Sequence, residues 1–304
     1  MHKMIFGCFA PSRVDAARAL LLAESIRTFA GQYSNLPFLI MRPVGGEQLT
    51  KTQYKSIELL DVELHSFELE PAAASFPFAG KVVASAAAEA LSDERSSQLV
   101  WMDYGTLVVN PVDLLLLMQG IRLGYRPVDH LLIGSSFDKP VDPFWAYIFQ
   151  ACGVTSEDIY PMVTSTDQVK MRPYINAGML VVRPEDQLFQ SWRDTFLEIY
   201  QDRRSLEFYE VQPLYRIFIH QAVLAGCVIA GYQPSETVQL PPEVNYPLHM
   251  HTQYPSRLQP STLNQLVSFR YEGYFSKPGW RQLLQVDPPL KDWLEERENL
   301  LSRR

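Results

Sequence analysis

Two apolar runs near residue 100 are separated by a single carboxylate, and this pattern constrains the chain more than any other. Leu99 to Met102 has the composition of a buried strand, Asp103 follows it, and a second apolar run extends from Leu107 to Val109. In open α/β sheets ligands bind outside the carboxyl ends of strands, so Asp103 lies where a phosphate, a metal ion or a sugar hydroxyl could meet it. An Asp after a strand also commonly starts a turn by accepting a bond from a nearby backbone N–H. The segment alone leaves both interpretations open.

Strand-like and helix-like patterns alternate through the first hundred residues. In the first helix-like segment Ser12 and Asp15 have the spacing of a capping box, and Gly31 can supply a left-handed stop. We expect strands at 4–10, 36–41, within 57–68 and at 99–102, and helices at 12–30 and 81–91. This alternation predicts a mostly parallel sheet with helices on both faces.

The second half of the chain is less regular. Residues 134–173 are rich in Pro and aromatic side chains, and we expect an insertion or lid there. The sheet resumes at Met179 to Val182, and a helix with one apolar, core-facing side follows from Pro184. The predicted organisation is a single domain over 1–286, with a nucleotide-binding half of about 1–133 and an acceptor and donor-sugar half of about 134–286, and then a charged, solvated helix over 287–304.

Composition excludes several classes of protein. With 47% hydrophobic and 20% charged residues among 304, the chain is of the ordinary globular kind. Its net charge of −7 repels a polyanion, and no dense basic run precedes Arg303 and Arg304, so we expect no nucleic-acid partner. Pro11 and Arg13 cut the N-terminal apolar stretch short, which favours a first strand over a signal sequence. No apolar run approaches the roughly 18 residues of a membrane span, so we expect no transmembrane segment and a soluble protein.

The cysteines predict a compartment. Cys8, Cys152 and Cys227 are odd in number, widely spaced and set among apolar residues. This pattern is typical of buried thiols in a reducing environment and has no metal-ligand spacing. We therefore expect the protein in the cytoplasm, while its oligomeric state stays open.

Five segments carry motifs whose order along the chain is informative. They are Trp-Met-Asp-x-x-Thr-Leu-Val around Asp103, Asn-Ala-Gly at 176–178, His-Gln-x-x-Leu at 220–224, Leu-Pro-x-x-x-Asn at 240–245 and, more loosely, Gly273 with Lys277, Pro278 and Trp280. Together they resemble the motifs of nucleotide-diphospho-sugar transferases of the GT-A fold, especially the glycogenin and galactosyltransferase-like retaining group. The resemblance implies an α/β fold in which a mostly parallel mixed sheet is flanked by helices. It also implies transfer of a sugar from a nucleotide-diphospho-sugar to an acceptor that the sequence does not identify.

The same resemblance implies roles for residues near the start of the chain. Phe9, Ala10 and Pro11 end the first strand, where such proteins hold the nucleotide base and ribose. Lys81 starts the helix whose counterpart carries a basic residue near the phosphates. We expect these residues to bind the nucleotide.

Two further motifs would border the sugar. Asn176, Ala177 and Gly178 would line the donor-sugar pocket, with Gly178 letting the backbone approach the ligand closely; a tight strand entry is the structural alternative. Gln221 matches the Gln of an Asp-Gln pair, whereas His220 stands where the Asp would orient the sugar or acceptor. His220 either does so with altered specificity or is an ordinary helix histidine. The predicted catalytic residues are Asp103, Asn176, His220 and Gln221.

The ligand set for a metal ion is incomplete in this chain. Relatives of this type hold Mn²⁺ or Mg²⁺ with both carboxylates of Asp-x-Asp and a late His, because hard oxygen ligands suit such ions. Here Gly105 occupies the second acidic position, and Arg270 stands where the His would be. We hypothesise that Arg270 and Lys277 supply as side chains the charge that a metal otherwise supplies, which favours metal independence. Together with Asp103 and Gly105 they would bind the nucleotide.

Two alternatives to that hypothesis stay open. If the register of the last motif differs, His251 or His249 would join Asp103 as a metal ligand. Otherwise Arg270 is a surface cation and the metal site has decayed.

The sequence thus favours a cytoplasmic glycosyltransferase. No Gly-rich phosphate loop, Gly-x-Ser-x-Gly elbow or catalytic Cys constellation supports another chemistry. The alternative is a non-catalytic binding or scaffolding protein that keeps the fold. An open pocket surrounded by Asp103, Asn176, Gln221, Arg270 and Lys277 would favour the enzyme, and a pocket filled by Tyr104 or Phe275 would favour the scaffold.

Overall fold

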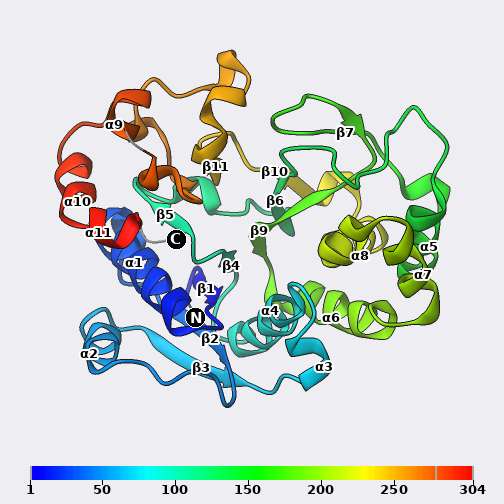
Figure 1. The fold of residues 1–304 in the computed structure, drawn as a ribbon, viewed down its shortest axis with the longest axis horizontal. Coiled ribbons are helices and arrows are strands. Elements are labelled where there is room, and N and C mark those ends of the chain that lie inside the picture. The colour runs from blue at the N-terminus through cyan, green and yellow to red at the C-terminus, as the bar shows by residue number, and fades with distance from the viewer. Residues whose placement is uncertain (1, 278, 303–304) are drawn as a thin grey trace.

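A seven-stranded sheet forms the centre of the computed structural model, which describes residues 2–277 and 279–302 (Figure 1). Its strands follow the order β10-β6-β9-β4-β1-β2-β3. All neighbouring pairs are parallel except those that β9 makes with β4 and β6, so the predicted mostly parallel mixed sheet is confirmed. The strands are β1 (Ile5–Phe9), β2 (Phe38–Pro43), β3 (Glu63–Phe67), β4 (Leu99–Met102), β6 (Leu123–Pro127), β9 (Ile175–Val182) and β10 (Thr237–Gln239).

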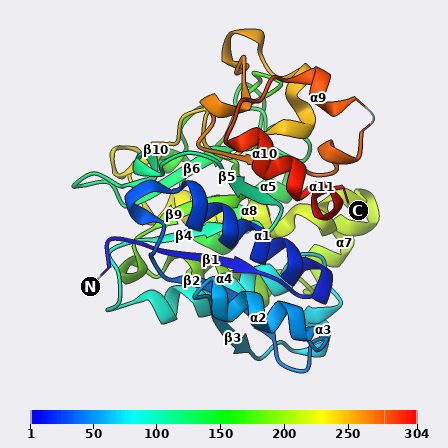
Figure 2. The same ribbon diagram turned by 90° about the vertical axis from the view of Figure 1, so that its left-hand side faces the viewer.

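Helices cover both faces of this sheet, as the alternating pattern predicted. Along β4, Val100 and Met102 pack with α1 (Arg13–Phe29) on one face, whereas Leu99 and Trp101 pack with α4 (Ala79–Ser92) and α6 (Leu188–Ile199) on the other. Figure 2 shows α1 lying across one side of the strands. The alternation of side chains along a strand therefore divides the core into two layers.

Three helices on the α4 side build the other half of the molecule. They are α5 (Pro143–Cys152), α7 (Arg203–Val211) and α8 (Pro213–Gly231), and α8 packs against β9, α5, α6 and α7. Among the described residues α8 alone is long and apolar enough to span a membrane by length and composition, and more than half of that window is buried inside the protein. The expectation that no apolar run approaches the length of a membrane span missed this helix, whose apolar residues are interrupted by Arg216, His220 and Gln221.

A second, three-stranded sheet brings the C-terminal part of the chain to the central sheet. Its strands are β5 (Thr106–Val108), β12 (Ser268–Arg270) and β11 (Tyr246–Pro247). The antiparallel register of β12 with β5 places Arg270 opposite Thr106, three residues after Asp103. The last motif of the sequence is thereby held beside the first.

Local capping explains where several helices begin. Ser12 and Asp15 form the predicted capping box, with Asp15 N–H donating to Ser12 Oγ at 3.1 Å. The predicted irregular region 134–173 instead contains α5, which Asp142 caps and Pro143 begins. A further unpredicted helix, α2 (Lys51–Leu59), follows a capping box formed by Thr50. The expectation of irregular structure was therefore wrong where α5 forms, and α2 was not expected.

Two other predicted helices differ from expectation. Pro184 begins a 3-10 turn, and α6 starts only at Leu188 because Gln187 adopts a left-handed conformation with φ 54°. The C-terminal region forms α10 (Leu290–Glu296) and α11 (Glu298–Leu301) and is not a solvated helix, since Trp293, Leu294 and Leu301 are buried. Arg303 and Arg304 lie outside the described residues. The remaining elements are α3 (Pro71–Ala74), α9 (Trp280–Leu283), β7 (Met162–Val163) and β8 (Lys170–Met171).

Candidate functional site

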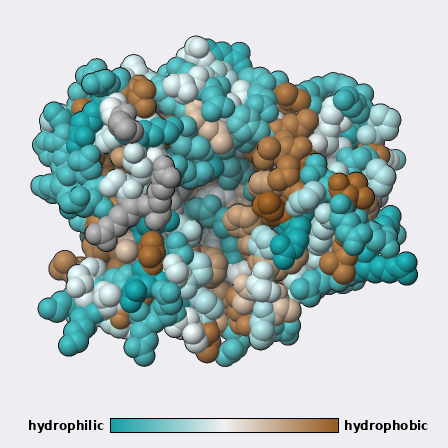
Figure 3. Space-filling model, viewed as in Figure 1, coloured by the Kyte–Doolittle hydropathy of each residue, from teal (hydrophilic) through white to brown (hydrophobic). Residues whose placement is uncertain are grey.

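A cavity of about 760 Å³ opens where β1 and β4 end and β9 begins. Figure 3 shows this face hollowed near its centre, with hydrophobic side chains gathered along one side. Because β9 is antiparallel to β4, its first residues meet the residues that follow β4. Predicted site residues on this wall are Phe9, Pro11, Lys81, Asp103, Gly105, Asn176, Gly178, His220, Gln221 and Arg270.

Asp103 is paired with a lysine at the base of this cavity. Lys81 Nζ lies 2.5 Å from Asp103 Oδ1, and the Lys81 side chain is largely buried. The backbone of Asp103 is fixed on both sides, since its N–H donates to the Gly178 carbonyl at 2.9 Å and its carbonyl accepts from Thr106 N–H at 3.0 Å. The carboxylate is thus both a turn residue and a cavity residue.

Lys81 reaches this position because α4 starts close to β1. A Cβ atom on Gly80 would lie 2.7 Å from the Phe9 ring, so glycine lets the first turn of α4 come this near without displacing that ring. The ammonium on the next residue then enters the cavity.

Asn176 and Gly178 form a compact turn of backbone and side chain opposite Asp103. Gly178 N–H donates to Asn176 Oδ1 at 2.8 Å. A Cβ atom on Gly178 would lie 2.8 Å from Asp103 Oδ2 and 2.9 Å from Asn176 Oδ1. Glycine is required here for space, and both functional groups stay next to the cavity.

His220 is a nearly buried residue of the cavity wall, and an aromatic ring stacks on it. It is 2% exposed and lies two turns into α8, not at a helix start, because α8 begins at Pro213. His220 Nδ1 is 3.0 Å from the Ile217 carbonyl, which it can reach only as an N–H donor. Burial, together with the nearby Lys81 ammonium, lowers the pKa of His220 to about 3, so its ring is neutral at pH 7.

The ring stacked on His220 belongs to Phe78. The two ring centroids are 4.4 Å apart with an interplanar angle of 22°. Phe78 has φ 61° and ψ 0°, a left-handed conformation that costs a residue with a side chain about 1–2 kcal/mol. Its side chain is nevertheless 44% exposed and lines the cavity.

Arg270 lines the cavity but is already paired. Its guanidinium is 2.5 Å from Asp129 and 3.1 Å from Glu272. Burial alone would lower the pKa of Arg270, but the carboxylates of Asp129, Glu272 and Asp103 outweigh it and raise the pKa. Much of its charge is therefore offset before any ligand arrives.

Several predicted residues lie elsewhere. Lys277 does not line the cavity, and its Nζ is 3.4 Å from the His249 carbonyl. His251 is bonded to the Tyr246 hydroxyl, outside the cavity wall. Ala10 and Ala177 are fully covered core residues whose side chains do not reach the cavity. Pro278 lies outside the described residues.

The residues at Asp103 do not suit a divalent metal ion. Gly105 has nothing within 4 Å of where a Cβ would be, so this position supplies space and no carboxylate. The Asp103 carboxylate faces the Lys81 ammonium, and within residues 2–277 and 279–302 no three His, Cys, Asp or Glu side chains form a group able to hold a metal. One carboxylate next to a cation falls far short of the several oxygen ligands such ions take.

The cavity is open. Four of the five residues expected to surround it, Asp103, Asn176, Gln221 and Arg270, do so. Tyr104 lies on the wall and leaves the space free, while Phe275 is 3% exposed in a separate core cluster. This arrangement favours the enzyme over the scaffolding alternative.

Three aromatic residues of the cavity wall were not predicted from the sequence. Phe76, Phe78 and Phe218 add an aromatic side to the cavity. The sequence signal was the placement of Phe76 and Phe78 directly before Gly80 and Lys81, but nothing in it predicts a left-handed Phe.

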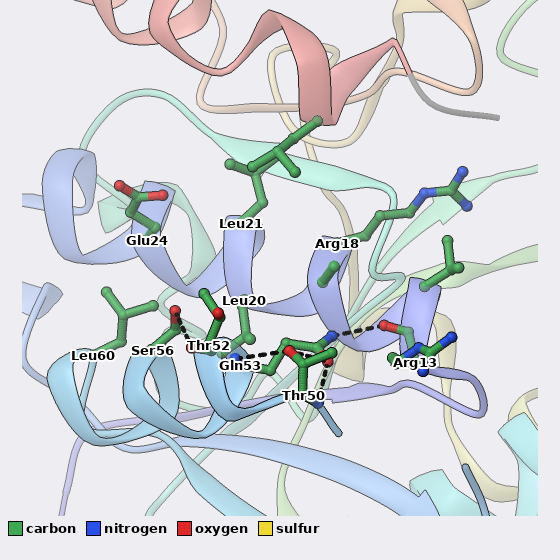
Figure 4. Close-up of a pocket in the computed structure, with 13 residues that line it drawn as sticks. Arg13, Arg18, Leu20, Leu21, Glu24, Thr50, Thr52, Gln53, Ser56 and Leu60 are labelled. Carbon is green, nitrogen blue, oxygen red and sulfur yellow. Dashed lines mark hydrogen bonds between the residues drawn. The ribbon is translucent and has the colours of Figure 1, made fainter. Parts of the chain in front are cut away.

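A second cavity of about 420 Å³ lies between α1 and α2 (Figure 4). In Figure 4 Gln53 bridges the two helices, its Nε2 donating to the Arg13 carbonyl at 2.7 Å while its Oε1 accepts from Thr50 N–H at 2.9 Å. None of the predicted site residues lines it, so the larger cavity is the candidate site.

Comparison with known proteins is consistent with this geometry. A family model described as Rhodobacterales glycosyltransferase domain matches residues 8–225, more than half of the chain. No curated protein sequence matches the chain. Among solved structures, the galactosyltransferase LgtC in complex with donor and acceptor sugar analogues is 15% identical and has a TM-score of 0.50, covering 99% of this chain and 95% of LgtC. The apo bifunctional glycosyltransferase WbbM is 13% identical with a TM-score of 0.50, covering 97% of this chain and 51% of WbbM.

Proposed function

The chain belongs to the Rhodobacterales glycosyltransferase domain family, and we propose that this glycosyltransferase of GT-A fold takes its sugar from a nucleoside-diphosphate sugar bound in the 760 Å³ cavity. The observation that carries the proposal is the position of Lys81 at the end of β1 and β4. A cation there, with Asn176 and Gln221 on the wall of the same cavity, can bind a diphosphate next to a sugar.

The chemistry of such a transfer defines what the site must supply. The bond between the anomeric carbon and the terminal phosphate oxygen breaks, and its electron pair leaves with the diphosphate. The acceptor oxygen forms the new bond to the anomeric carbon and passes its proton to the departing phosphate. Negative charge therefore grows on the diphosphate in the transition state, and a fixed cation beside it lowers the barrier.

We propose that Lys81 is the principal cation and that no divalent metal is required. The ammonium has three donors, so it can bond a phosphate oxygen while it keeps its contact with Asp103. A divalent ion bound to Asp103 would be repelled by Lys81, since two like unit charges 4 Å apart cost about 4 kcal/mol at the effective dielectric of a protein surface. Arg270 contributes less than the sequence hypothesis assumed, because Asp129 and Glu272 already pair with it.

Thermal melting of the purified protein with UDP, GDP, CDP, ADP and their common sugars tests the proposal. Each ligand is added with EDTA and, separately, with Mn²⁺. A ligand at a hundred times its Kd stabilises by about 2.7 kcal/mol, which raises the melting temperature measurably. We expect one nucleotide and its sugar to do so in EDTA.

Two results would contradict different parts of the proposal. A shift that needs Mn²⁺ would overturn metal independence and leave the donor intact. The absence of a shift with every nucleotide sugar, in either condition, would overturn the donor proposal.

A further inference from the structure

The cavity contains an aromatic ring that no part of the proposed reaction yet uses. Phe78 is strained into the left-handed region, a conformation that favours glycine and that tends to persist at functional sites. Its side chain remains 44% exposed on the cavity wall, although turning inward would bury apolar surface. The fold thus holds an aromatic face open to the cavity.

His220, which lies beneath this ring, differs in residue type from the motif that the sequence resembles. His220 stands where those proteins carry an Asp that orients the sugar or acceptor. Here His220 stacks on Phe78, and its Nδ1 is engaged by the Ile217 carbonyl. Its backbone is fixed as well, since Trp192 Nε1 donates to the His220 carbonyl at 2.7 Å. His220 is therefore a fixed, uncharged support for Phe78.

The location of Phe78 indicates which part of a ligand it would meet. Lys81 Nζ lies 5.4 Å from the centroid of the Phe78 ring. In a nucleoside-diphosphate sugar the sugar is bonded directly to the phosphate that Lys81 would hold. The transferred sugar would therefore lie next to Lys81, in the cavity that Phe78 and Gln221 also line.

We propose that Phe78, supported by His220, is the platform on which the C–H face of the transferred sugar packs. This inference rests on the proposed function and deepens it by assigning a specificity-determining residue. The ligand class is a pyranose with a continuous C–H face, held at this point by ring contact and not by hydroxyl bonds to a carboxylate. Aromatic side chains suit this role because they present a large apolar surface with few rotatable bonds.

Calorimetric titration of Phe78 variants of the full-length protein tests the platform. The probes are the nucleoside diphosphate that binds the wild type and its nucleotide sugar. For Phe78→Ala we expect the Kd of the nucleotide sugar to rise about tenfold, or 1.4 kcal/mol, and the Kd of the nucleoside diphosphate to change by less than about twofold. Phe78→Tyr keeps the ring and should keep the sugar affinity.

Phe78→Gly separates the ring from the strained backbone. Glycine relieves the left-handed strain that Ala retains, so the Gly variant should melt at a higher temperature than the Ala variant. If the ring binds sugar, both variants lose sugar affinity equally despite this difference in stability.

The possible failures are distinguishable. Unchanged nucleotide-sugar affinity in Phe78→Ala, with a wild type that binds, would overturn the platform alone. An equal loss for nucleoside diphosphate and nucleotide sugar would also overturn it, because the ring would then act through Lys81. A wild type that binds no nucleotide sugar would overturn both the platform and the proposed function.

Discussion

The ammonium of Lys81 lies 2.5 Å from the carboxylate of Asp103 in the wall of the larger cavity. The two residues come from α4 and from the end of β4, and both line the cavity. Lys81 is the cation of the proposed donor site, and Asp103 offsets its charge. Neutralising the two side chains should therefore change the affinity for a nucleoside diphosphate in opposite directions.

Removal of the ammonium should abolish most nucleotide affinity. In Lys81→Met the diphosphate loses a charge-assisted bond and faces an unpaired Asp103, so we expect a roughly ten- to hundredfold weaker Kd for the nucleoside diphosphate in EDTA. Lys81→Arg should retain more affinity than Lys81→Met. Lys55→Met, on exposed α2, is a matched control for the loss of a lysine. Equal affinity in Lys81→Met and wild type, measured by calorimetry, would contradict the role of Lys81.

Neutralisation of the carboxylate should have the reverse effect. Asp103→Asn keeps the shape of the side chain and removes a negative charge next to Lys81, so nucleoside diphosphate should bind in EDTA as tightly as before or more tightly. A metal-dependent site would instead lose affinity, because the carboxylate would be a ligand. Titration of this variant with and without Mn²⁺ distinguishes the two cases.

The tight contact at Gly178 predicts a catalytic defect. In Gly178→Ala the new methyl group would meet Asp103 Oδ2 at 2.8 Å and Asn176 Oδ1 at 2.9 Å, so one of these groups must move. Displacement of a catalytic group by about 1 Å costs roughly a hundredfold in rate, and we expect a loss of transfer of that order. Gly231→Ala, where nothing lies within 4 Å, controls for the substitution itself. Retention of full transfer activity by Gly178→Ala would refute this prediction.

His220 predicts an acid-sensitive fold. Its pKa is lowered by burial and by Lys81 to about 3 in the folded state, while the unfolded chain titrates near 6.5. The unfolded state therefore binds more protons, and the stabilisation present above pH 6.5 is lost as pH falls toward 3. The contribution of His220 to the slope should approach about 1.4 kcal/mol per pH unit between these two pKa values.

The matched variant for this test is His220→Gln, which should lose less stability than wild type between pH 6.5 and 4 in urea unfolding. Glu89 opposes the trend, because burial raises its pKa to about 7 and protonation then favours the fold. Its contribution is the same in both proteins and cancels in the difference. Parallel pH profiles would show that His220 does not titrate as described.

The pair of Arg270 and Asp129 predicts a structural defect. Both side chains are about nine-tenths buried, so Arg270→Gln leaves Asp129 uncompensated and should lower the free energy of unfolding by about 3 kcal/mol. The double variant Arg270→Gln, Asp129→Asn should recover part of that loss. Urea unfolding of the two variants measures it, and an unchanged midpoint in Arg270→Gln would argue that the pair is not coupled.

The sheet could be predicted because its signals are local. The strand at 99–102 and the capping box of Ser12 and Asp15 are short patterns, and the structure reproduces both. The helix at 143–152 also had local signals, with Asp142 before Pro143, but its Pro-rich and aromatic surroundings suggested irregular structure. The composition of a long segment predicts its secondary structure poorly when a short helix-capping motif lies within it.

Some residues of the candidate site could be predicted from the sequence, and others could not. Asp103, Asn176 and Gln221 could be brought together because the resemblance implies that their motifs meet at one site, although Gln221 lies inside α8 and not at its start. The partners of Arg270 could not, because Asp129 is 141 residues away and meets it only through the packing of the small sheet. The strained Phe78 has no sequence signal, since intrinsic preference argues against a left-handed Phe.

The direction of β9 separates two sides of this site. Because β9 enters the sheet at the cavity and leaves it at the opposite edge, the segment before it, 134–173, is attached to the cavity rim at Asn176. Within this segment α5 packs in the core, but the exposed loops around it belong to the kind of structure that accepts insertions and deletions more readily than strands do. Lengthening those loops can reshape the entrance of the cavity while β1, β4 and Lys81 keep their places.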